Sequence, residues 1–374
     1  MISDSGKNRR ILISFLGNIN YDTRARNLRA SLIERGFEVE TVSFDWFDRP
    51  QGGDIPVVKL TKGKSSAGFY LKFAFTVILK LLFNKYDLYI AADIYNLPFL
   101  SFFAKFRSKP LFYDSRELFR YLAGLTGKKS VQTLLSFIEE SYIRDCDKII
   151  VTGMMDAGVL IEDYGLSQDK FILLRNLPRK SARSEAKDLR KEFNLPHDAV
   201  ILIYQGVIVK GRGLRKIIEL LPENGSLHLI ILGEGELRVE LEKYAQGLGV
   251  ASRVIFAGSV TQDELLSYTA GADIGCTLIE NISKSYYYAL PNKLFEYVAA
   301  GIPVLASNLP QIKQIIDLYG VGRYVNPENE DEIIEALNHL CDPEIRREIK
   351  LNSMKAAEEL NWEREFSNES HHFV

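Results

Sequence analysis

The amino-acid sequence predicts an α/β protein made of two Rossmann-like domains, each a doubly wound parallel sheet. Three observations indicate this fold. The 374-residue chain is long for one hydrophobic core and suits two domains. Short apolar runs alternate with longer amphipathic ones, and most short runs are continuously β-branched or aromatic, as in strands that are buried on both faces of a parallel sheet. The alternation stops once, at the polar segment 175–185, and then starts again.

The first half of the chain alternates strands with helices. Strands are predicted at 11–15, 39–43, 57–60, 88–91, 111–113, 148–152 and 171–174. Amphipathic helices are predicted between them, at 24–35, 69–82, 98–106, 130–144 and 157–163. The segment 175–185 is polar, contains a proline and has no apolar period, so we predict that it is the hinge between two domains.

The same alternation returns after the hinge. Strands are predicted at 200–204, 227–232, 254–257, 274–278, 303–306 and 322–325, and helices at 214–221, 236–248, 262–270, 292–300, 330–340 and 343–360. We therefore predict a first domain at 1–176 and a second domain at 177–360. A C-terminal helix at about 361–374 is expected to cross back to the first domain, with Trp362 as its anchor. Ligands of doubly wound sheets bind outside the carboxyl ends of the strands, so the site is expected in a cleft between two facing sheets.

Composition narrows the class of protein. The formal net charge is −2 and 46% of the residues are hydrophobic, which is typical of a soluble globular protein and indicates no nucleic-acid partner. Cys146, Cys276 and Cys341 are isolated and lack metal-ligand spacing, so we expect reduced thiols. The apolar run 69–83 is shorter than the ~20 residues of a spanning helix, and 1–10 lacks the pattern of a signal peptide. A cytoplasmic location is expected.

One segment departs from this charge balance. Residues 61–110 contain eight Lys or Arg residues and two acidic residues, a net charge of +6, and phenylalanines lie between the basic residues. A cationic, aromatic-rich face suits peripheral contact with an anionic membrane. Alternatively, the aromatic residues belong to the core and the lysines form a solvated rim. Under the first interpretation the protein works at the inner face of the cell membrane.

The segment 289–304 holds the strongest local motif, Ala-Leu-Pro-Asn-Lys-Leu-Phe-Glu-Tyr followed by Val-Ala-Ala-Gly-Ile-Pro-Val. Pro291 suits the first turn of a helix and Gly301 suits its end. Lys293 and Glu296 lie three residues apart, on one face of that first turn. A helix N-terminus with a lysine favours a phosphate, and the glutamate can accept hydrogen bonds from a ribose diol. The alternative is an exposed ion pair between the two side chains.

This segment resembles the donor-binding signature of glycosyltransferase family 4, whose members have the GT-B fold and retain the anomeric configuration. The resemblance implies that Lys293 lies near the donor diphosphate and that Glu296 binds ribose hydroxyls. The other donor-binding positions on this segment are Leu290, Pro291 and Asn292. Members usually carry another glutamate eight positions before the second one, where this sequence has Tyr288. Recognition of the sugar ring is then expected from Glu280 or from the loop 281–288.

The resemblance extends to a glycine-rich loop at 204–213, Tyr-Gln-Gly-Val-Ile-Val-Lys-Gly-Arg-Gly. Glycines let a backbone approach a diphosphate closely, and a basic side chain can neutralise it; the alternative is a tight turn with solvated charges. Members commonly carry Arg directly after the first glycine, where this sequence has Val207. The diphosphate-binding role is therefore expected for Arg212, with Lys210 second. The donor-side backbone positions that the resemblance implies are Gly206, Gly235 and Gly258.

The resemblance also covers the loop after the first predicted strand, whose family counterpart lies under the donor phosphates and beside the acceptor. It implies a donor-side role for Gly17 and acceptor-side roles for Asn18, Asp22 and Arg24. Asp22 is equally a predicted N-cap of the helix that follows. Asp93 is also expected on the acceptor side.

The segment Tyr-Asp-Ser-Arg-Glu at 113–117 stands where many relatives carry Asp-x-His-Glu, so Arg116 replaces a histidine. All five histidines lie after the hinge, which excludes a catalytic histidine in the first domain. Arg116 is expected either to bind a phosphate of the acceptor or to pair with Glu117 or Glu140.

The sequence thus predicts a metal-independent, retaining glycosyltransferase, a hexosyltransferase, in which Arg212 and Lys293 are catalytic because they stabilise the charge on the departing nucleoside diphosphate. No cofactor is expected, and the Asp-x-Asp string at 145–147 lies where capping acids are common. The expected partners are a UDP- or GDP-sugar donor and a glycan or polyprenyl-linked acceptor of bacterial-type surface polysaccharide synthesis. Two alternatives remain. Tyr288 and Arg116 favour an inactive nucleotide-sugar-binding or membrane scaffold, and a nucleotide-sugar epimerase of the same fold is the other.

Overall fold

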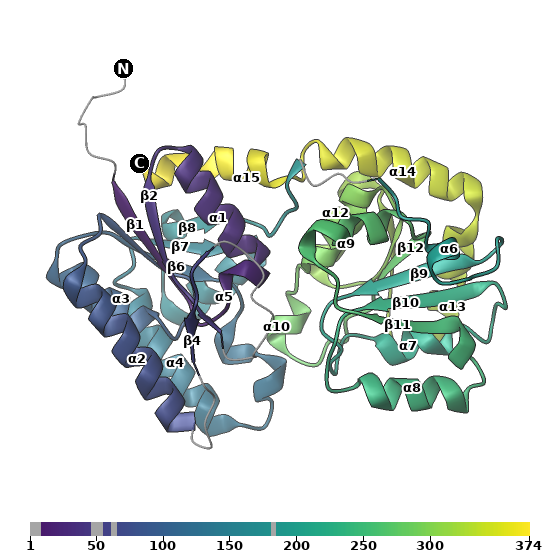
Figure 1. The fold of residues 1–374 in the computed structure, drawn as a ribbon, viewed down its shortest axis with the longest axis horizontal. Coiled ribbons are helices and arrows are strands. Elements are labelled where there is room, and N and C mark those ends of the chain that lie inside the picture. Colours follow the sequence, from purple (N-terminus) through teal and green to yellow (C-terminus); the bar gives the residue numbers. More distant parts are fainter. Residues whose placement is uncertain (1–8, 46–54, 61–65, 181–184) are drawn as a thin grey trace. The chain divides into compact units, whose positions relative to one another are not determined.

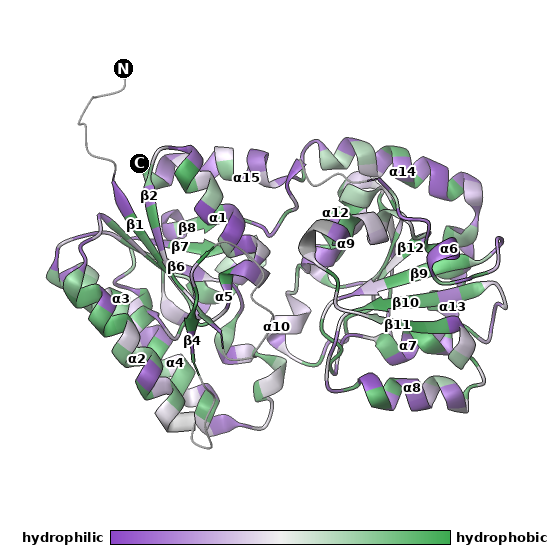
Figure 2. Ribbon diagram, in the orientation of Figure 1, coloured by the Kyte–Doolittle hydropathy of each residue, from purple (hydrophilic) through white to green (hydrophobic). Residues whose placement is uncertain are grey.

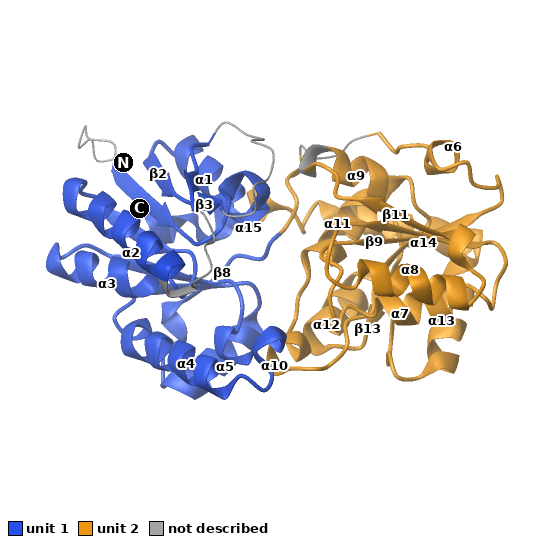
Figure 3. Cartoon of the chain, turned by 60° about the horizontal axis from the view of Figure 1, so that its bottom comes forward, with its two compact units in different colours: residues 1–176, 366–374 blue, residues 177–365 orange. Residues whose placement is uncertain are grey.

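The computed structural model describes residues 9–45, 55–60, 66–180 and 185–374 (Figure 1). By their internal contacts these residues form two compact units, Met1–Asn176 with Phe366–Val374, and Leu177–Glu365 (Figure 3). The C-terminal residues thus group with the first unit, although they follow the second in the sequence. Two predicted features, Lys62 and Lys64 of the basic window, lie outside the described residues.

The first unit is built on a six-stranded, all-parallel sheet with the order β2-β1-β5-β6-β7-β8. Its strands are β1 Arg10–Ser14, β2 Glu38–Val42, β5 Leu88–Ala91, β6 Leu111–Ser115, β7 Lys148–Val151 and β8 Phe171–Leu173. Its longer helices are α1 Thr23–Glu34, α2 Ser66–Phe83, α3 Leu97–Phe106, α4 Lys129–Ile143 and α5 Met154–Tyr164. The chain reverses direction across the sheet after β2, so β1 and β5 flank the switch point at which doubly wound sheets bind ligands.

Helices α2, α3 and α4 pack side by side in the first unit (Figures 1 and 3). Crossovers between parallel strands are right-handed, so the reversal of direction after β2 puts these three helices on one face of the sheet and α1 on the other. The side of α2 that faces its unit is a stripe of four apolar residues at helical spacing, Phe69, Phe73, Val77 and Leu81, all buried.

One predicted strand does not join the main sheet. Residues 57–60 contribute β4, Val58–Lys59, which pairs only with β3, Phe44–Asp45, in a separate two-stranded ladder. Both residues of β4 are exposed. A strand inside this sheet is covered by helices on both faces, and Lys59 at its middle would be buried without a counter-charge.

The second unit has a six-stranded parallel sheet with the Rossmann order β11-β10-β9-β12-β13-β14. Its strands are β9 Val200–Gln205, β10 Leu227–Leu232, β11 Val254–Gly258, β12 Ile274–Thr277, β13 Val304–Ser307 and β14 Gly322–Val325. Its helices are α6 Leu189–Glu192, α7 Leu214–Glu219, α8 Arg238–Gly247, α9 Gln262–Ala270, α10 Lys284–Tyr287, α11 Asn292–Ala300, α12 Pro310–Tyr319, α13 Glu330–Cys341 and α14 Pro343–Ala357. Here β9 and β12 flank the switch point.

Two apolar clusters sandwich this second sheet, one containing residues of α7, α8 and α13, and the other containing residues of α11 and α12. Helix α12 is absent from the sequence prediction, although Ile312, Ile315 and Ile316 repeat at helical spacing and are buried against the sheet. Pro310 in its first turn was the available signal for its start.

The end of the chain changes units within α15, Trp362–Glu369. Trp362 was predicted as the anchor on the first domain, but it belongs to the second unit, where it is fully buried and its backbone N–H donates to the carbonyl of Pro178. Phe366 and Phe373 belong to the first unit. The ring of Phe373 lies 5.4 Å from that of Phe112 on β6.

Among the residues that the structure describes, no helix has both the length and the apolar character needed to cross a membrane. Cys146, Cys276 and Cys341 are free thiols.

Candidate functional site

In the second unit, the glycine-rich loop follows β9 at the switch point. Gly206, Gly211 and Gly213 all have positive φ angles, of 128°, 82° and 69°. Residues other than glycine rarely adopt this backbone conformation. A Cβ on Gly213 would lie 1.9 Å from the carbonyl oxygen of Leu278, the residue after β12. The glycine therefore lets the loop pack directly on the end of the neighbouring strand.

Backbone hydrogen bonds join the loops after β9, β10 and β11. The N–H of Gly206 donates to Leu232, and that of Gly233 donates to Gly258 at 2.8 Å. Gly235, after β10, packs closely on the glycine-rich loop, because a Cβ on it would lie 2.1 Å from the carbonyl oxygen of Ile208. The predicted donor-side glycines 206, 235 and 258 are thus brought together by the sheet.

Lys293 lies in the first turn of α11 and is buried. Its Nζ lies 3.7 Å from the ring centroid of Tyr204 on β9, and 3.3 Å from where a Cβ on Gly206 would be. No hydrogen bond or ion pair of this ammonium group is found within the described residues. Burial lowers the pKa of Lys293 well below its ordinary value of 10.5, and the nearby charge of Arg212 lowers it further. The predicted alternative, an exposed Lys293–Glu296 ion pair, is not what these residues form.

Arg212 is half-buried near Lys293, on the glycine-rich loop. Its guanidinium lies 4.8 Å from the ring centroid of Tyr286 in α10, and this helix follows β12. Arg212 also has no ion pair within the described part of the chain. Lys210, the second choice from the sequence, is exposed. The carboxyl ends of β9 and β12 therefore bring together two basic side chains that form no ion pair within the described residues, although the nearby charge of Glu296 favours protonation of Lys293.

Glu296 is oriented by a buried amide. The Nε2 of Gln205, at the end of β9, donates to a carboxylate oxygen of Glu296, and the Oε1 of Gln205 accepts a hydrogen bond of 2.8 Å from the hydroxyl of Thr269. Gln205 and Thr269 are both buried, whereas Glu296 is partly accessible. The glutamate is held one turn beyond Lys293 with its orientation set.

The other predicted donor-side residues lie at the start of α11 and in the segment between β12 and α11. Pro291 is the N-cap of α11, and Gly301 ends the helix in the left-handed conformation, so the predicted bounds of this helix are confirmed. The remaining positions are Leu290, which is partly buried, and Asn292, which is exposed. The backbone N–H of Glu280 donates to the carbonyl of Gly211 at 3.0 Å. Tyr288 is the C-cap of α10 and its carbonyl accepts a hydrogen bond from Gln311.

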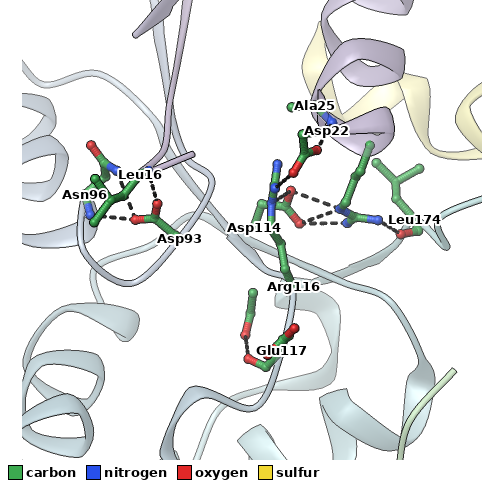
Figure 4. Close-up of polar contacts among 11 residues, drawn as sticks. Leu16, Asp22, Ala25, Asp93, Asn96, Asp114, Arg116, Glu117 and Leu174 are labelled. Atoms are coloured by element: carbon green, nitrogen blue, oxygen red, sulfur yellow. Dashed lines mark hydrogen bonds and ion pairs between the residues drawn. The ribbon is translucent and has the colours of Figure 1, made fainter. Parts of the chain in front are cut away.

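The first unit has its own polar cluster where β1, β5 and β6 end (Figure 4). Asp22 caps α1 by accepting a hydrogen bond of 2.7 Å from the N–H of Ala25, so its predicted capping role is confirmed. Asp22 also pairs with Arg116, and the Nε of Arg116 lies 3.4 Å from Asp114. Pairing with Glu117 or Glu140 was one of two expectations for Arg116, whereas its ion-pair partners among the described residues are Asp22 and Asp114.

Arg116 lies over the ring of Phe15, 4.8 Å from its centroid, and its buried Nη2 atom has no hydrogen-bond partner among the described residues. Burial opposes its charge, but Asp22 and Asp114 hold the pKa of Arg116 above its ordinary value. Arg24 has two partners of its own. Its guanidinium forms a buried ion pair of 2.7 Å with Asp114 and donates a hydrogen bond to the carbonyl of Leu174.

Asp93 follows β5 and is buried (Figure 4). It accepts hydrogen bonds from the backbone N–H of Leu16 and from the backbone and side chain of Asn96. Burial raises the pKa of Asp93 despite these hydrogen bonds. Gly17 and Asn18 shape the adjoining turn: a Cβ on Gly17 would lie 2.7 Å from the ring of Phe15, and Asn18 caps the 3₁₀ turn Ile19–Tyr21.

Several contributing residues are missing from the sequence prediction. Gln205 and Tyr204 end a buried strand next to the glycine loop, and a polar residue at the carboxyl end of a strand is the signal that was available for Gln205. Asp114 and Asn96 likewise follow or end strands of the first sheet. Gln205, Asp114 and Asn96 each have a partner that lies 64 to 91 residues away in the sequence, and only the fold reveals those pairs.

Within the described ranges, no group of His, Cys, Asp or Glu side chains has the arrangement of a metal site. Both acids of the Asp-x-Asp string have protein partners. Asp145 lies 3.5 Å from Lys105, and Asp147 accepts a hydrogen bond from the N–H of Leu111.

Two doubly wound parallel sheets, each with polar residues at its switch point, are the architecture of GT-B glycosyltransferases, and the comparison with solved structures gives the same fold. The chain superposes on sucrose-phosphate synthase of Thermosynechococcus elongatus with a TM-score of 0.79 at 17% identity, covering 98% of both chains. It superposes on HepE of Anabaena, in complex with UDP and glucose, with a TM-score of 0.74 at 14% identity, covering 98% of this chain and 99% of that one.

Sequence comparison matches one family over part of the chain. Residues 185–356 match the model of glycosyl transferases group 1. An uncharacterized glycosyltransferase of Methanocaldococcus jannaschii is 27% identical over 184 residues, 48% of this chain and 46% of that protein. Alpha-monoglucosyldiacylglycerol synthase of Streptococcus pneumoniae is 22% identical over 217 residues, 55% of this chain and 48% of that protein. The matches span about half the length of these curated relatives. The second unit thus carries the match to the group 1 glycosyltransferases, which are glycosyltransferase family 4.

Proposed function

We propose that this protein transfers a sugar from a nucleoside-diphosphate donor to a glycan or lipid-linked acceptor, with retention of the anomeric configuration, in surface polysaccharide or glycoconjugate synthesis. The observation that carries the proposal is the pair of cations, Lys293 and Arg212, at the switch point of the second sheet. Neither has an ion pair in the described chain, and Lys293 is buried.

An unneutralised buried ammonium group is costly unless a ligand supplies the opposite charge. A diphosphate matches this site because it carries two adjacent anionic groups, and the free N–H groups in the first turn of α11 add to the attraction. UDP is bound in the solved structures of HepE, which share this fold, and this supports a nucleoside-diphosphate ligand for the present chain. We therefore propose that Arg212 and Lys293 hold the donor diphosphate.

Glu296 is proposed to accept hydrogen bonds from the ribose hydroxyls of the donor. Its carboxylate is one turn from Lys293, which matches the adjacency of ribose and diphosphate in a nucleotide-sugar. The hydrogen-bond chain from Thr269 through Gln205 fixes the carboxylate before the donor arrives, so less entropy is lost on binding.

The chemical step breaks the bond between the anomeric carbon and the diphosphate oxygen. Negative charge grows on that oxygen, so Arg212 and Lys293 stabilise the transition state more than the bound donor. No metal or covalent nucleophile is part of the proposal. The acceptor hydroxyl is proposed to attack on the face from which the diphosphate leaves, which retains the configuration.

On the acceptor side we propose that Arg116 donates a hydrogen bond from its free Nη2 to the acceptor. The cluster contains Arg24 and Arg116 against Asp22, Asp114 and Asp93, and so it has no surplus positive charge. This balance favours a neutral sugar hydroxyl over a phosphate as the partner of Nη2. A lipid-linked acceptor fits the predicted contact of residues 61–110 with an anionic membrane, and the relative from Streptococcus pneumoniae is named for a glycolipid product.

An inactive nucleotide-sugar-binding scaffold is the second candidate, favoured by Tyr288 at the usual place of a glutamate and by Arg116 at that of a histidine. Incubation with a panel of UDP- and GDP-sugars separates the functions. Acceptor-dependent release of the nucleoside diphosphate supports the transferase. Binding without turnover supports the scaffold, and interconversion of sugars without release supports an epimerase.

Substitutions test the donor site. Lys293→Ala should lower kcat/KM by at least about 100-fold because a charge that acts on the leaving group is lost. Glu296→Ala should raise the donor KM by about 10-fold or more. Lys243→Ala is the matched control, since this lysine is exposed on α8. Activity in Lys293→Ala and Glu296→Ala equal to that of Lys243→Ala would remove the donor-site assignment.

A further inference from the structure

Helix α2 has a second apolar stripe that its unit does not cover. Leu71, Phe75, Leu79 and Leu82 follow one another at helical spacing and are 70%, 64%, 36% and 56% exposed. This stripe is distinct from the buried one that begins at Phe69. A helix that is apolar on more than one side is normally buried on all of them or inserted in a membrane. Hydrophobic residues extend along α2 and α3 in Figure 2.

The neighbouring helices continue this surface. On α3, Phe102 and Phe106 are 64% and 77% exposed, and their rings are nearly parallel, with centroids 6.4 Å apart. On α4, Leu134 and Phe137 are 56% and 67% exposed. Helix α3 contacts both α2 and α4. We call the exposed side of these three helices the outer face of α2–α4. Helix α4 lies outside the basic window 61–110, so the face is larger than the sequence indicates.

The charge on the outer face of α2–α4 is positive. Helices α2 and α3 contain no acidic residue and carry Lys72, Lys80 and Lys105, and α4 adds one exposed acidic residue, Glu140. Lys80 pairs with Glu40 and Lys105 with Asp145. Lys72, and also Lys128 and Lys129 at the start of α4, are exposed and have no ion pair within the described residues.

We infer that the outer face of α2–α4 docks on an anionic lipid bilayer, with its phenylalanine and leucine side chains in the boundary between headgroups and acyl chains and its lysines on the lipid phosphates. Exposed Phe and Leu flanked by unpaired Lys are the pattern of interfacial helices. A second copy of the chain is a poorer occupant, because it would oppose two faces of the same positive charge. The inference goes beyond sugar transfer, since membrane binding needs neither donor nor acceptor.

Sedimentation of the full chain with vesicles tests this inference. The protein should bind vesicles of phosphatidylcholine with phosphatidylglycerol and bind pure phosphatidylcholine much more weakly, and salt should reduce the binding. Phe75→Ser with Phe106→Ser should weaken binding by at least about tenfold. Lys72→Glu with Lys129→Glu should weaken it by a similar factor. Leu318→Ser and Val239→Ser are matched controls, because these residues are 71% and 60% exposed in the second unit.

A Trp probe reports the depth of insertion. Phe106→Trp should show an added blue-shifted emission that bilayer-embedded quenchers reduce, whereas Leu318→Trp should not. Circular dichroism and nucleotide binding check that each variant is folded with an intact donor site. Equal vesicle binding by the parent and the Phe75/Phe106 variant would overturn the inference. Concentration-dependent dimers that this variant abolishes, without vesicle binding by the parent, would overturn it in favour of an interface between copies.

Discussion

At the scale of single residues, the proposed donor site depends on two basic side chains, Lys293 and Arg212, that lie near each other without an ion pair within the described residues. The cost is visible in Lys293, whose pKa is held well below 10.5 by burial and by Arg212. A bound diphosphate supplies negative charge at this point and should raise that pKa. Nucleotide binding is therefore expected to be coupled to the protonation of one side chain.

Nucleotide binding should be accompanied by the uptake of a proton. Between the lowered pKa of the free protein and the raised pKa of the complex, Lys293 is neutral when free and charged when bound, so binding takes up a proton. Nucleotide affinity should fall as the pH rises through this window, by up to about tenfold per pH unit. Calorimetry in buffers with different ionisation enthalpies, above about pH 8 where the phosphates are fully ionised, measures the proton uptake.

Lys293→Arg is the control for this coupling, because arginine stays protonated at all these pH values. It should bind nucleotide without taking up a proton. The same proton uptake in Lys293→Arg as in the parent would show that another group titrates, and the assignment of the coupling to Lys293 would be wrong.

At the scale of elements, the glycine-rich loop and the end of β12 are fitted to each other. Gly213 combines a φ of +69° with a position 1.9 Å from the Leu278 carbonyl for any added Cβ. Gly213→Ala should therefore lower the free energy of unfolding of the second unit by more than about 1 kcal/mol, because of the left-handed backbone conformation and the steric clash. It should also weaken nucleotide binding, since the shifted loop carries Arg212.

Gly225→Ala is the matched control for the loop, because a Cβ at this position would meet nothing within 4 Å. Chemical denaturation followed by circular dichroism gives both free energies. If the Gly213 and Gly225 variants are equally stable, the loop has room to move and the close packing described above is not required.

At the scale of the whole molecule, the end of the chain stabilises the unit that contains its beginning. Phe373 is buried and its ring contacts those of Phe112 and Phe366, while the guanidinium of Arg35 lies over Phe366. Phe373→Ala should destabilise the first unit by about 3 kcal/mol, the usual cost of removing a buried aromatic ring. Calorimetry should show a lower midpoint temperature for unfolding of the first unit. Nucleotide binding by the second unit should be largely unchanged.

Val374→Ala, one residue further on, should change the free energy of unfolding by less than about 0.5 kcal/mol, because Val374 is 77% exposed. An equal loss of stability in both variants, or in neither, would mean that the C-terminal segment does not anchor to the first sheet through Phe373.

Local patterns were enough to predict much of the fold. Apart from residues 57–60, the continuous apolar runs correspond to the strands of the two six-stranded parallel sheets, and Pro291 with Gly301 marks the bounds of α11. The spacing of Lys293 and Glu296 is also local, as is the N-cap at Asp22. These features depend on neighbours within a few residues, where hydrogen bonding and helix geometry act directly on the sequence.

The sequence by itself thus determined the class of fold, the resemblance to a family, and the residues proposed to meet the donor. Only the tertiary structure decided that Lys293 is buried over Tyr204, that Gln205 orients Glu296, and that Arg116 pairs with Asp22 and Asp114 while one nitrogen stays without a partner. The physical reason is that parallel sheets bring the ends of strands together from distant parts of the chain, and the burial and charge balance at such a point depend on all of them.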